Sequence, residues 1–583
     1  MIFNIACMRL FVAFTALLVF SFANARSQRP LTVFEQSGGK ASATYDACIS
    51  FYRQVVKLNP ALHMQEMGQT DAGIPLHLIL CSNDHRFDPT KWDRKSKLVI
   101  LVNNGIHPGE PDGIDASMML VRDIAVGKYH LPDNIILAII PVYNIGGALN
   151  RSSTSRVNQD GPEYYGFRGN AQNLDLNRDF TKADSREAKS FTEIFHYLNP
   201  DILVDNHVSD GADYQHTMTL LSTQYDKLGA VGQYQRNELD PALYKAMEGI
   251  GWPMVPYVNV EDQTPDKGWH AFYDPPRFSS GYAALWNCIA YVPETHMLKP
   301  FKQRTEATYA LLQQMIKIAS QQAQQIKNIR AAAATALLEQ TRFPLHWSVD
   351  TTKPTLWPFK GYEGAYKTSA ITGQQRLYYD HNKPFEKNVP VYDHYIEDRF
   401  ADAPAAYVLQ QGWHDVIDRL QWNKVQMTRI THDTLMQVNA YYIDAYQTMT
   451  RPYEKHYRHY DTKVSGFPTK ILLHKGDYII PIQQPAKRFL IEMLEPTGDD
   501  SYFAWNFFDG ILQQKEGYSD YRWEDVAERY VQQHPELVQQ LQQKKQTDTA
   551  FAKDADAQLQ FIYHHSPYYE PVHLRYPVYR IER

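Results

Sequence analysis

Four runs of consecutive apolar residues, separated by amphipathic stretches, most strongly constrain the fold of this chain. They are KLVILVN (97–103), NIILAIIPV (134–142), DILVD (201–205) and CIAYV (288–292). Runs that are apolar throughout are typical of strands that are buried on both faces of a sheet. The intervening stretches 114–126 and 185–198 have the apolar spacing of helices. We therefore predict an α/β fold in which helices cover both faces of a sheet.

The length of the chain indicates more than one domain, because 583 residues exceed what one core usually organises. The stretch 301–340 has the composition of a helix, and the prolines that follow it indicate a connection. We expect an α/β domain over residues 26–340, after the targeting segment described below. Residues 341–583 would then form an accessory region of α/β or α+β class.

The accessory region contains weaker patterns. We expect a strand at 405–410, a helix at 413–422 and a strand at 425–430. Two further strands, 470–474 and 478–482, flank a Lys-Gly-Asp sequence that suits a tight turn. The polar, Gln-rich stretch 525–545 is expected to be a surface helix.

The N-terminus has the three parts of a secretory signal. Met8-Arg9 precedes the apolar run LFVAFTALLVFSF, which ends in Ala23-Asn24-Ala25. We expect residues 1–25 to be removed and the protein to be secreted or periplasmic. No later segment is apolar for long enough to cross a bilayer, so we expect no membrane span in the mature chain.

The cysteines and the net charge indicate which disulfide and which class of partner to expect. In an exported protein cysteines can form disulfides, and we expect Cys48 to pair with Cys81. Cys288 lies in an apolar stretch, which indicates a small buried residue. The net charge is −6, with both signs well mixed along the chain. Since there is no basic stripe, we expect no nucleic-acid partner.

Two potential metal ligands follow the first buried strand. His107 and Glu110 are separated by Pro108-Gly109, a pair that forces a turn and lets the two side chains converge. A neutral imidazole and a carboxylate are good zinc ligands. They lie just past the carboxyl end of a strand, where open α/β folds place their sites.

A third potential ligand, His207, comes two residues after the strand DILVD. Two ligands close together and a third about a hundred residues later is the usual spacing of a catalytic zinc site. With two histidines and one glutamate as ligands, a zinc ion has one coordination position left for a water molecule. A hydrogen-bonded loop histidine is the alternative for His207, and His216 is a rival ligand.

An acidic residue, Glu294, follows the strand CIAYV. A carboxylate beside a metal-activated water can take its proton and later deliver that proton to a leaving group. A surface glutamate in a salt bridge is the alternative. His296, two residues further on, is another candidate for a site residue, but its position relative to Glu294 can direct its side chain elsewhere.

The run RGNAQNLDLNR, residues 168–178, supplies hydrogen-bond donors. The guanidinium groups of Arg168 and Arg178, together with Asn177, suit a carboxylate or a developing oxyanion. Asp175 can hold the second nitrogen of a ligand histidine and so fix its tautomer. Taken alone, the run also fits an ordinary polar loop.

Taken together, these segments resemble the zinc carboxypeptidase family typified by pancreatic carboxypeptidase A, over about residues 45–320. The resemblance implies a zinc carboxypeptidase-like catalytic domain within residues 26–340, with an α/β/α fold and a mixed sheet. It implies one zinc ion, with His107, Glu110 and His207 as its ligands. Asp175 would then be the partner of His107.

The resemblance also implies roles for the remaining residues. Glu294 would be the general base, and Arg168 would polarise the scissile carbonyl and stabilise its oxyanion. Asn177 and Arg178 would hold the terminal carboxylate of the substrate. The family has a tyrosine that closes over the substrate; Tyr273 lies near the expected place, and Tyr282 is a rival.

Some features depart from the common pattern of the family. Val208 follows His207, where many relatives carry a small hydroxyl residue. The segment 277–282 should help to line the specificity pocket, but its preference cannot be read from the sequence. Segments such as HVSDGADYQ and VPETHMLKP resemble those of a bacterial secreted branch of the family, which has a large C-terminal extension.

The function that these features predict is that of a secreted zinc metallocarboxypeptidase. Its partner would be a peptide with a free C-terminal carboxylate, from which it removes C-terminal residues. One alternative is a zinc amidase or deacylase that acts on murein peptides or acyl-amino acids. A second alternative is a non-catalytic binding protein of the cell envelope.

Overall fold

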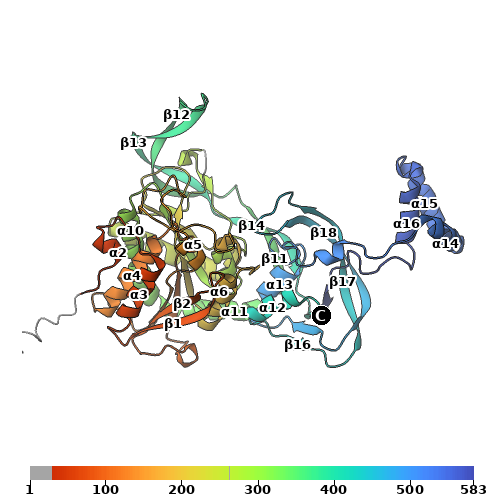
Figure 1. The fold of residues 1–583 in the computed structure, drawn as a ribbon, viewed down its shortest axis with the longest axis horizontal. Helices are drawn as coiled ribbons and strands as arrows, with labels where there is room; N and C mark the ends of the chain where they lie inside the picture. Colours follow the sequence, from red (N-terminus) through yellow and green to blue (C-terminus); the bar gives the residue numbers. More distant parts are fainter. Residues whose placement is uncertain (1–28, 261–262, 583) are drawn as a thin grey trace, which may run out of the picture. The chain divides into compact units, whose positions relative to one another are not determined.

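The computed structural model describes residues 29–260 and 263–582 (Figure 1). The expected signal, residues 1–25, lies outside this range. No helix within the described residues combines the length and the apolar character needed to cross a membrane. The chain divides into two compact units, Met1–Ala333 with Val349–Tyr395 and Ala334–Ser348 with Ile396–Arg583, which we call unit 1 and unit 2.

Unit 1 is built on a mixed sheet. Its strands lie in the order β1-β2-β4-β3-β5-β10-β7-β8, and β6 pairs with β10. The strands β4, β3, β5 and β10 are mutually parallel. The pairs β1–β2, β2–β4 and β10–β7 are antiparallel, whereas β7 and β8 are parallel. Their bounds are β1 (Leu62–Gln69), β2 (Pro75–Cys81), β3 (Leu98–Asn103), β4 (Ile135–Ile140), β5 (Ile202–Asp205), β6 (His207–Ser209), β7 (Met218–Ser222), β8 (Val255–Pro256) and β10 (Ile289–His296).

The central strands are buried along their whole length, which requires cover on both faces of the sheet. The covering helices include α4, which packs against α10, and α6, which packs against β1. The α/β/α fold with a mixed sheet that the sequence predicts is therefore confirmed. Among the described residues, the α-helices of unit 1 are α2 (Val33–Gln36), α3 (Tyr45–Val55), α4 (Asp112–Ala125), α5 (Ile145–Leu149), α6 (Arg186–Leu198), α7 (Ala230–Tyr234), α8 (Asp240–Gly249), α9 (Ser279–Ala284) and α10 (Phe301–Gln321), and α11 (Ala323–Glu339) continues into unit 2.

Two expected strand ends differ from the structure. The sequence places Glu294 and His207 after their strands, but both residues lie within strands, β10 and β6. The reason is the parallel pairing of β6 with β10, which sets Glu294 opposite His207. These two residues, 87 positions apart in sequence, are thus brought side by side by sheet hydrogen bonds.

A long ribbon of two strands, β12 (Thr355–Thr368) and β13 (Gln375–Tyr392), follows the expected boundary at residue 340 and folds with unit 1. Its base pairs with β9 (Trp269–His270) and packs in an apolar cluster that includes Tyr214 and Phe359. Its far end projects away from the rest of the unit (Figure 1).

Unit 2 contains an antiparallel sheet in the order β16-β19-β15-β20-β17-β18 and a strand pair, β11 with β14. Strands β18 and β19 flank the turn at Lys475-Gly476-Asp477 as expected, but they do not pair with each other: β18 pairs with β17, while β19 pairs with β15 and β16. The elements are β11 (Arg342–Val349), β14 (Tyr395–Asp402), β15 (Ala406–Leu409), α12 (His414–Trp422), β16 (Thr428–Arg429), β17 (Thr434–Thr448), β18 (His459–Leu473), β19 (Tyr478–Pro481), α13 (Lys487–Leu494), α14 (Asp520–Gln533), α15 (Pro535–Thr547), α16 (Ala555–His564) and β20 (Val578–Ile581).

The expected disulfide between Cys48 and Cys81 is also wrong. Cys48 lies on α3 and Cys81 ends β2, and both are fully buried free thiols, as is Cys288. Burial raises the pKa of the Cys48 and Cys81 thiols above the usual range. These side chains therefore serve as small apolar residues of the core.

A buried arginine fastens the start of α4 to α10. Arg304 is fully buried and its Nε donates to Asp112 Oδ2 over 3.0 Å. Its other nitrogens donate to backbone carbonyls, including those of Met297 and Gly161. Because Asp112 opens α4 two residues after Glu110, this ion pair fixes the loop that holds two of the potential metal ligands.

We predict that Arg304→Met destabilises unit 1 by about 3–5 kcal/mol, since it leaves a buried carboxylate and several carbonyls without their partner. The melting temperature followed by circular dichroism should fall by on the order of 10 °C. Lys302→Met, an exposed change on the same helix, is the matched control. Equal melting temperatures for the two variants would contradict this account of Arg304.

Candidate metal centre

A cavity of about 520 Å³ lies where β3 and β5 end and where β6 and β10 run side by side. Topology accounts for this position, because parallel strands direct the residues at their carboxyl ends to one edge of the sheet. Eight of the residues singled out in the sequence line the cavity: His107, Glu110, Arg168, Asn177, Arg178, His207, Val208 and Glu294.

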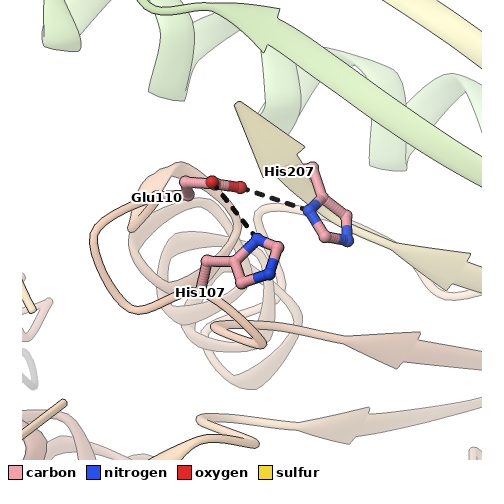
Figure 2. A group of neighbouring side chains, drawn as sticks. All are labelled: His107, Glu110 and His207. Atoms are coloured by element: carbon pink, nitrogen blue, oxygen red, sulfur yellow. Dashed lines mark hydrogen bonds and ion pairs between the residues drawn. The ribbon is translucent and has the colours of Figure 1, made fainter. Parts of the chain in front are cut away.

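His107, Glu110 and His207 converge on one point (Figure 2). One donor atom from each lies within 4.8 Å of the other two. The Nδ1 atom of His107 is 3.2 Å from Glu110 Oε1, and the Nδ1 atom of His207 is 3.2 Å from Glu110 Oε2. All three side chains are buried, and they form the one such cluster of three or more potential ligands found among the described residues.

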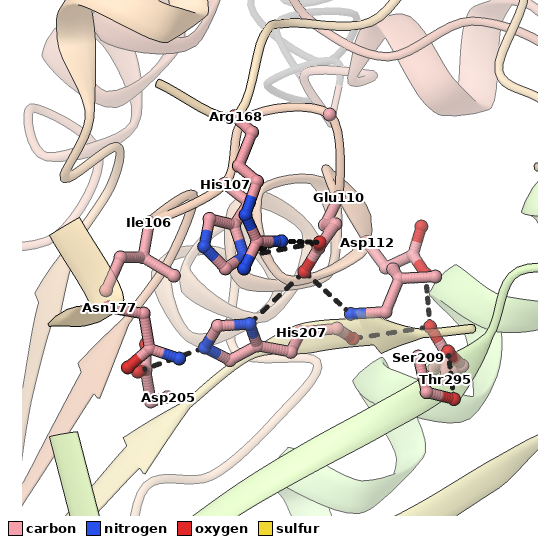
Figure 3. A network of polar contacts seen from close by, with 12 residues as sticks. Ile106, His107, Glu110, Asp112, Arg168, Asn177, Asp205, His207, Ser209 and Thr295 are labelled. Carbon is pink, nitrogen blue, oxygen red and sulfur yellow. Dashed lines mark hydrogen bonds and ion pairs between the residues drawn. The ribbon is translucent and has the colours of Figure 1, made fainter. Parts of the chain in front are cut away.

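Each histidine is held by a carboxylate on the side away from Glu110, and Figure 3 shows Asp205 in this position beside His207. His107 Nε2 lies 2.9 Å from Asp175 Oδ1, and His207 Nε2 lies 3.1 Å from Asp205 Oδ2. An ionised carboxylate only accepts hydrogen bonds, so each Nε2 carries a proton. In the neutral rings the lone pairs are then on the Nδ1 atoms, which both face Glu110. This is the arrangement in which histidine binds a metal.

The turn between His107 and Glu110 depends on a residue without a side chain. The amide of Glu110 donates to the carbonyl of His107 over 2.8 Å, which closes the turn. A Cβ atom on Gly109 would lie 2.7 Å from Arg156 Cδ and 3.0 Å from the carbonyl oxygen of Gly166. Glycine is therefore needed for Arg156 to reach Glu110, whose Oε1 lies 3.0 Å from Arg156 Nη1.

The charges around the cluster favour a bound cation. Burial alone would raise the pKa of Glu110, but His107 and Arg156 outweigh it and hold that pKa well below the usual range. Burial likewise opposes a charge on His207, yet Asp205 and Glu110 raise its pKa well above the ordinary value. The carboxylates of the site thus attract positive charge to the space between the two Nδ1 atoms. The donor set fits a divalent metal ion.

Glu294 lies beside this cluster in the same cavity, opposite His207 on the neighbouring strand. Burial raises the pKa of Glu294 to about 8; Glu110 adds to this rise, and His207 opposes it. Arg168 faces the cluster, with its Nη1 3.8 Å from Glu110 Oε1 and 3.5 Å from His107 Nδ1. Its Nε donates to Asp175 Oδ2 over 2.9 Å, which fixes the guanidinium at the cavity.

Asn177 and Arg178 lie in a short 3-10 turn, Leu176–Arg178, capped by Asp175. The Asp175 side chain accepts from the amide of Asn177 over 2.9 Å. The Arg178 guanidinium lies over the ring of Phe278, 4.2 Å from its centroid. The turn thus fixes a cation and an amide group along one wall of the cavity.

The two tyrosines considered from the sequence have different surroundings. Tyr273 is half-buried and its ring packs 5.5 Å from that of Tyr395; it is not among the residues that line the cavity in the described structure. Tyr282 is fully buried, and its hydroxyl lies 3.3 Å from His196 Nε2. The aromatic side chains that do line the cavity are Tyr257, Phe272 and Phe278.

The rival histidines are used elsewhere. His216 Nδ1 lies 3.0 Å from the carbonyl oxygen of Pro253, and its Nε2 accepts from the amide of Lys360. His296 is fully buried with its Nε2 2.7 Å from the carbonyl oxygen of Ala212. Both rings therefore hold backbone segments together instead of facing the metal ligands.

Three residues at the site escaped the sequence analysis. Asp205 could have been found, since it ends a buried strand two residues before His207. Arg156 reaches Glu110 from a loop whose sequence gives no signal. Asp274 lines the cavity from the loop before α9, and only the folded chain brings it there.

No protein-family model matches this chain. It is similar to carboxypeptidase 2 of Trichophyton rubrum, with 19% identity over 496 residues that cover 80% of this chain and 85% of the relative. Carboxypeptidase 2 of Trichophyton tonsurans is also 19% identical, over 70% of this chain and 74% of its own length.

Among solved structures, a metallo-carboxypeptidase from Burkholderia cenocepacia aligns with a TM-score of 0.37 and 16% identity, over 48% of this chain and 70% of its own. Carboxypeptidase A from Helicoverpa armigera aligns with a TM-score of 0.34 and 15% identity, over 57% and 82%. In sequence, the chain resembles the zinc carboxypeptidase family, and the enzyme class this indicates is a metallopeptidase hydrolase.

We predict that Asp205→Asn weakens metal binding by about 10- to 100-fold, because His207 loses the carboxylate that fixes its tautomer. Competition between the protein and a chromophoric chelator for Zn²⁺ measures the change. Asp210→Asn, which alters an exposed carboxylate that lines the cavity and accepts a hydrogen bond from Asn158, is the control. Unchanged affinity in Asp205→Asn would show that Asp205 does not support the metal site.

Proposed function

We propose that this protein is a secreted zinc metallocarboxypeptidase that removes residues from the C-terminus of peptides. The observation that carries the proposal is the convergence of His107 Nδ1, Glu110 and His207 Nδ1 in a cavity that also holds Glu294. Secretion is proposed from the signal-like sequence at residues 8–25. The named relatives are carboxypeptidases, which supports the reaction class.

His107, Glu110 and His207 would hold the ion, and the nitrogen and oxygen donors favour zinc. When bound, zinc would supply Lewis-acid activation of a water molecule and of the scissile carbonyl. Asp175 and Asp205 keep the two imidazoles in the tautomer that leaves Nδ1 free for the ion. Arg156 holds Glu110 from the opposite side.

Glu294 would act as the general base and acid. A carboxyl group whose pKa lies near neutrality can take a proton from water and return it to the leaving amine. Arg168 would donate to the carbonyl oxygen as negative charge builds up on it. The bond from Arg168 Nε to Asp175 supports this role, since it presents the remaining nitrogens to the cavity.

Asn177 and Arg178 would bind the terminal carboxylate of the substrate. A guanidinium and an amide supply several donors to one carboxylate, and both side chains line the cavity that contains the metal ligands. The same pair suits any substrate with a terminal carboxylate. Murein peptides and acyl-amino acids therefore form the alternative substrate class, and activity on those compounds alone would favour a zinc amidase or deacylase.

We predict that Glu294→Gln lowers kcat by roughly 10²- to 10⁴-fold, because the side chain can no longer move a proton. Zinc content should remain one ion per chain. Mass spectrometry of a peptide mixture measures turnover, and elemental analysis measures zinc. Normal turnover by Glu294→Gln would contradict the role assigned to this residue.

We predict that Arg178→Gln raises KM for peptides with a free C-terminal carboxylate by roughly 30-fold or more, since truncating one partner of a buried charge pair costs about 2 kcal/mol or more. The wild type should discriminate between each peptide and its C-terminal amide, and the variant should lose most of this discrimination. Steady-state kinetics on matched acid and amide peptides measures both. If the variant kept the full preference for the acid, another residue would be the carboxylate site.

A further inference from the structure

The cavity that contains the metal ligands is also lined by apolar side chains. Leu221 on β7 and Val292 on β10 are register partners in the sheet, and Val292 lies two residues before Glu294 on the same face of its strand. Phe272 and Phe278 line the same cavity from the loop before α9. These four side chains provide apolar surface that suits the hydrocarbon part of a substrate side chain.

The carboxylate of Asp274 lines the same cavity. Asp274 is 5% exposed. The hydroxyl of Ser280 donates to its Oδ2. Its Oδ1 accepts no hydrogen bond from the described residues, and Asp274 forms no ion pair with them. The carboxylate thus has one oxygen left to receive a donor from the cavity.

A positive charge close to Asp274 would stabilise its carboxylate. Burial raises the pKa of Asp274 to about 6, although Arg178, His207 and Arg277 work against this rise. At neutral pH the group is therefore mainly ionised while it is nearly buried. A buried charge without a close partner is costly, so a cation delivered by a ligand would be stabilised there.

The charges of the cavity match a residue with two charged groups. The Arg178 guanidinium lies over the ring of Phe278, and Asp274 precedes Phe278 by four residues in the same loop. A C-terminal lysine or arginine has a carboxylate for Arg178 and a side-chain cation for Asp274. An aliphatic or aromatic C-terminal residue would leave the carboxylate of Asp274 desolvated and without a partner.

We infer that the released C-terminal residue has a basic side chain of the lysine or arginine class, whose cation binds Asp274 while its alkyl stem packs on the apolar lining. The inference rests on the proposed function, since it assigns the side-chain preference of that same site. Asp274 is then the specificity-determining residue. Ser280 is the positioning residue that holds its Oδ2.

The test compares peptides that differ only at the C-terminal residue: lysine, acetyl-lysine, norleucine and glutamate. Norleucine keeps most of the alkyl stem of lysine without the ammonium, and acetyl-lysine removes the charge. With the zinc-loaded wild type we expect kcat/KM to be at least about tenfold higher for lysine than for norleucine. Asp274→Asn, which keeps the shape and the bond from Ser280, should bring this ratio close to one.

Asp210→Asn is the matched control, because it removes a negative charge from an exposed residue that lines the same cavity. It should keep the lysine-to-norleucine ratio of the wild type. Binding of the same peptides to Glu294→Gln, measured by calorimetry, gives the ratio without turnover. Circular dichroism shows whether each variant is folded, and the wild-type ratio stands even if Asp274→Asn does not fold.

The outcomes separate this inference from the proposed function. Cleavage of the norleucine peptide as fast as the lysine peptide would overturn the inference and leave the carboxypeptidase proposal standing. A lysine preference that Asp274→Asn retains would overturn the role of Asp274. If no peptide in the set lost its C-terminal residue and none bound to Glu294→Gln, the proposed function would fail, and the inference with it.

Discussion

The structure of the site depends on a surplus of buried negative charge around two histidines. Asp175 and Asp205 each hold an Nε2 atom, and Glu110 faces both Nδ1 atoms. Buried carboxylates in such number are stable only with cations close by. Arg156 and Arg168 supply part of the positive charge, and a divalent ion between the Nδ1 atoms would supply the rest. The proposed metal-assisted hydrolysis depends on this need for a cation between the two histidines.

The mixed sheet holds these groups in place. The strands β3, β5 and β10 are parallel, so the residues at their carboxyl ends meet at one edge although they lie far apart in the chain. The short strand β6 adds a direct link by pairing His207 with Glu294. From the other side, Arg304 ties the start of α4, and with it the ligand loop, to α10. A rigid sheet thus supports the side chains that would bind and orient the substrate.

Much of unit 1 could be predicted from the sequence, because buried strands and a turn such as His-Pro-Gly-Glu leave strong local signals. The turn also indicated that His107 and Glu110 can converge, whereas the choice of His207 as the third ligand came from the resemblance to a known family. Contacts made by the folded chain leave no such signal: Asp274 and Arg156 reach the cavity from irregular loops. In unit 2, the turn at Lys475-Gly476-Asp477 was predicted, but which strands pair was not: β18 pairs with the equally long β17. Cys48 and Cys81 are apolar core residues, although their number and context allowed a disulfide.

The central claim is that His107, Glu110 and His207 bind one zinc ion. Anomalous diffraction at the zinc absorption edge, from crystals of the protein purified with one equivalent of zinc, tests it most directly. The account predicts a single strong anomalous peak about 2.0–2.2 Å from the Nδ1 atoms of both histidines and from a Glu110 oxygen. Zinc bound elsewhere in such crystals, with direct contacts between Glu110 and the two imidazoles retained, would contradict it.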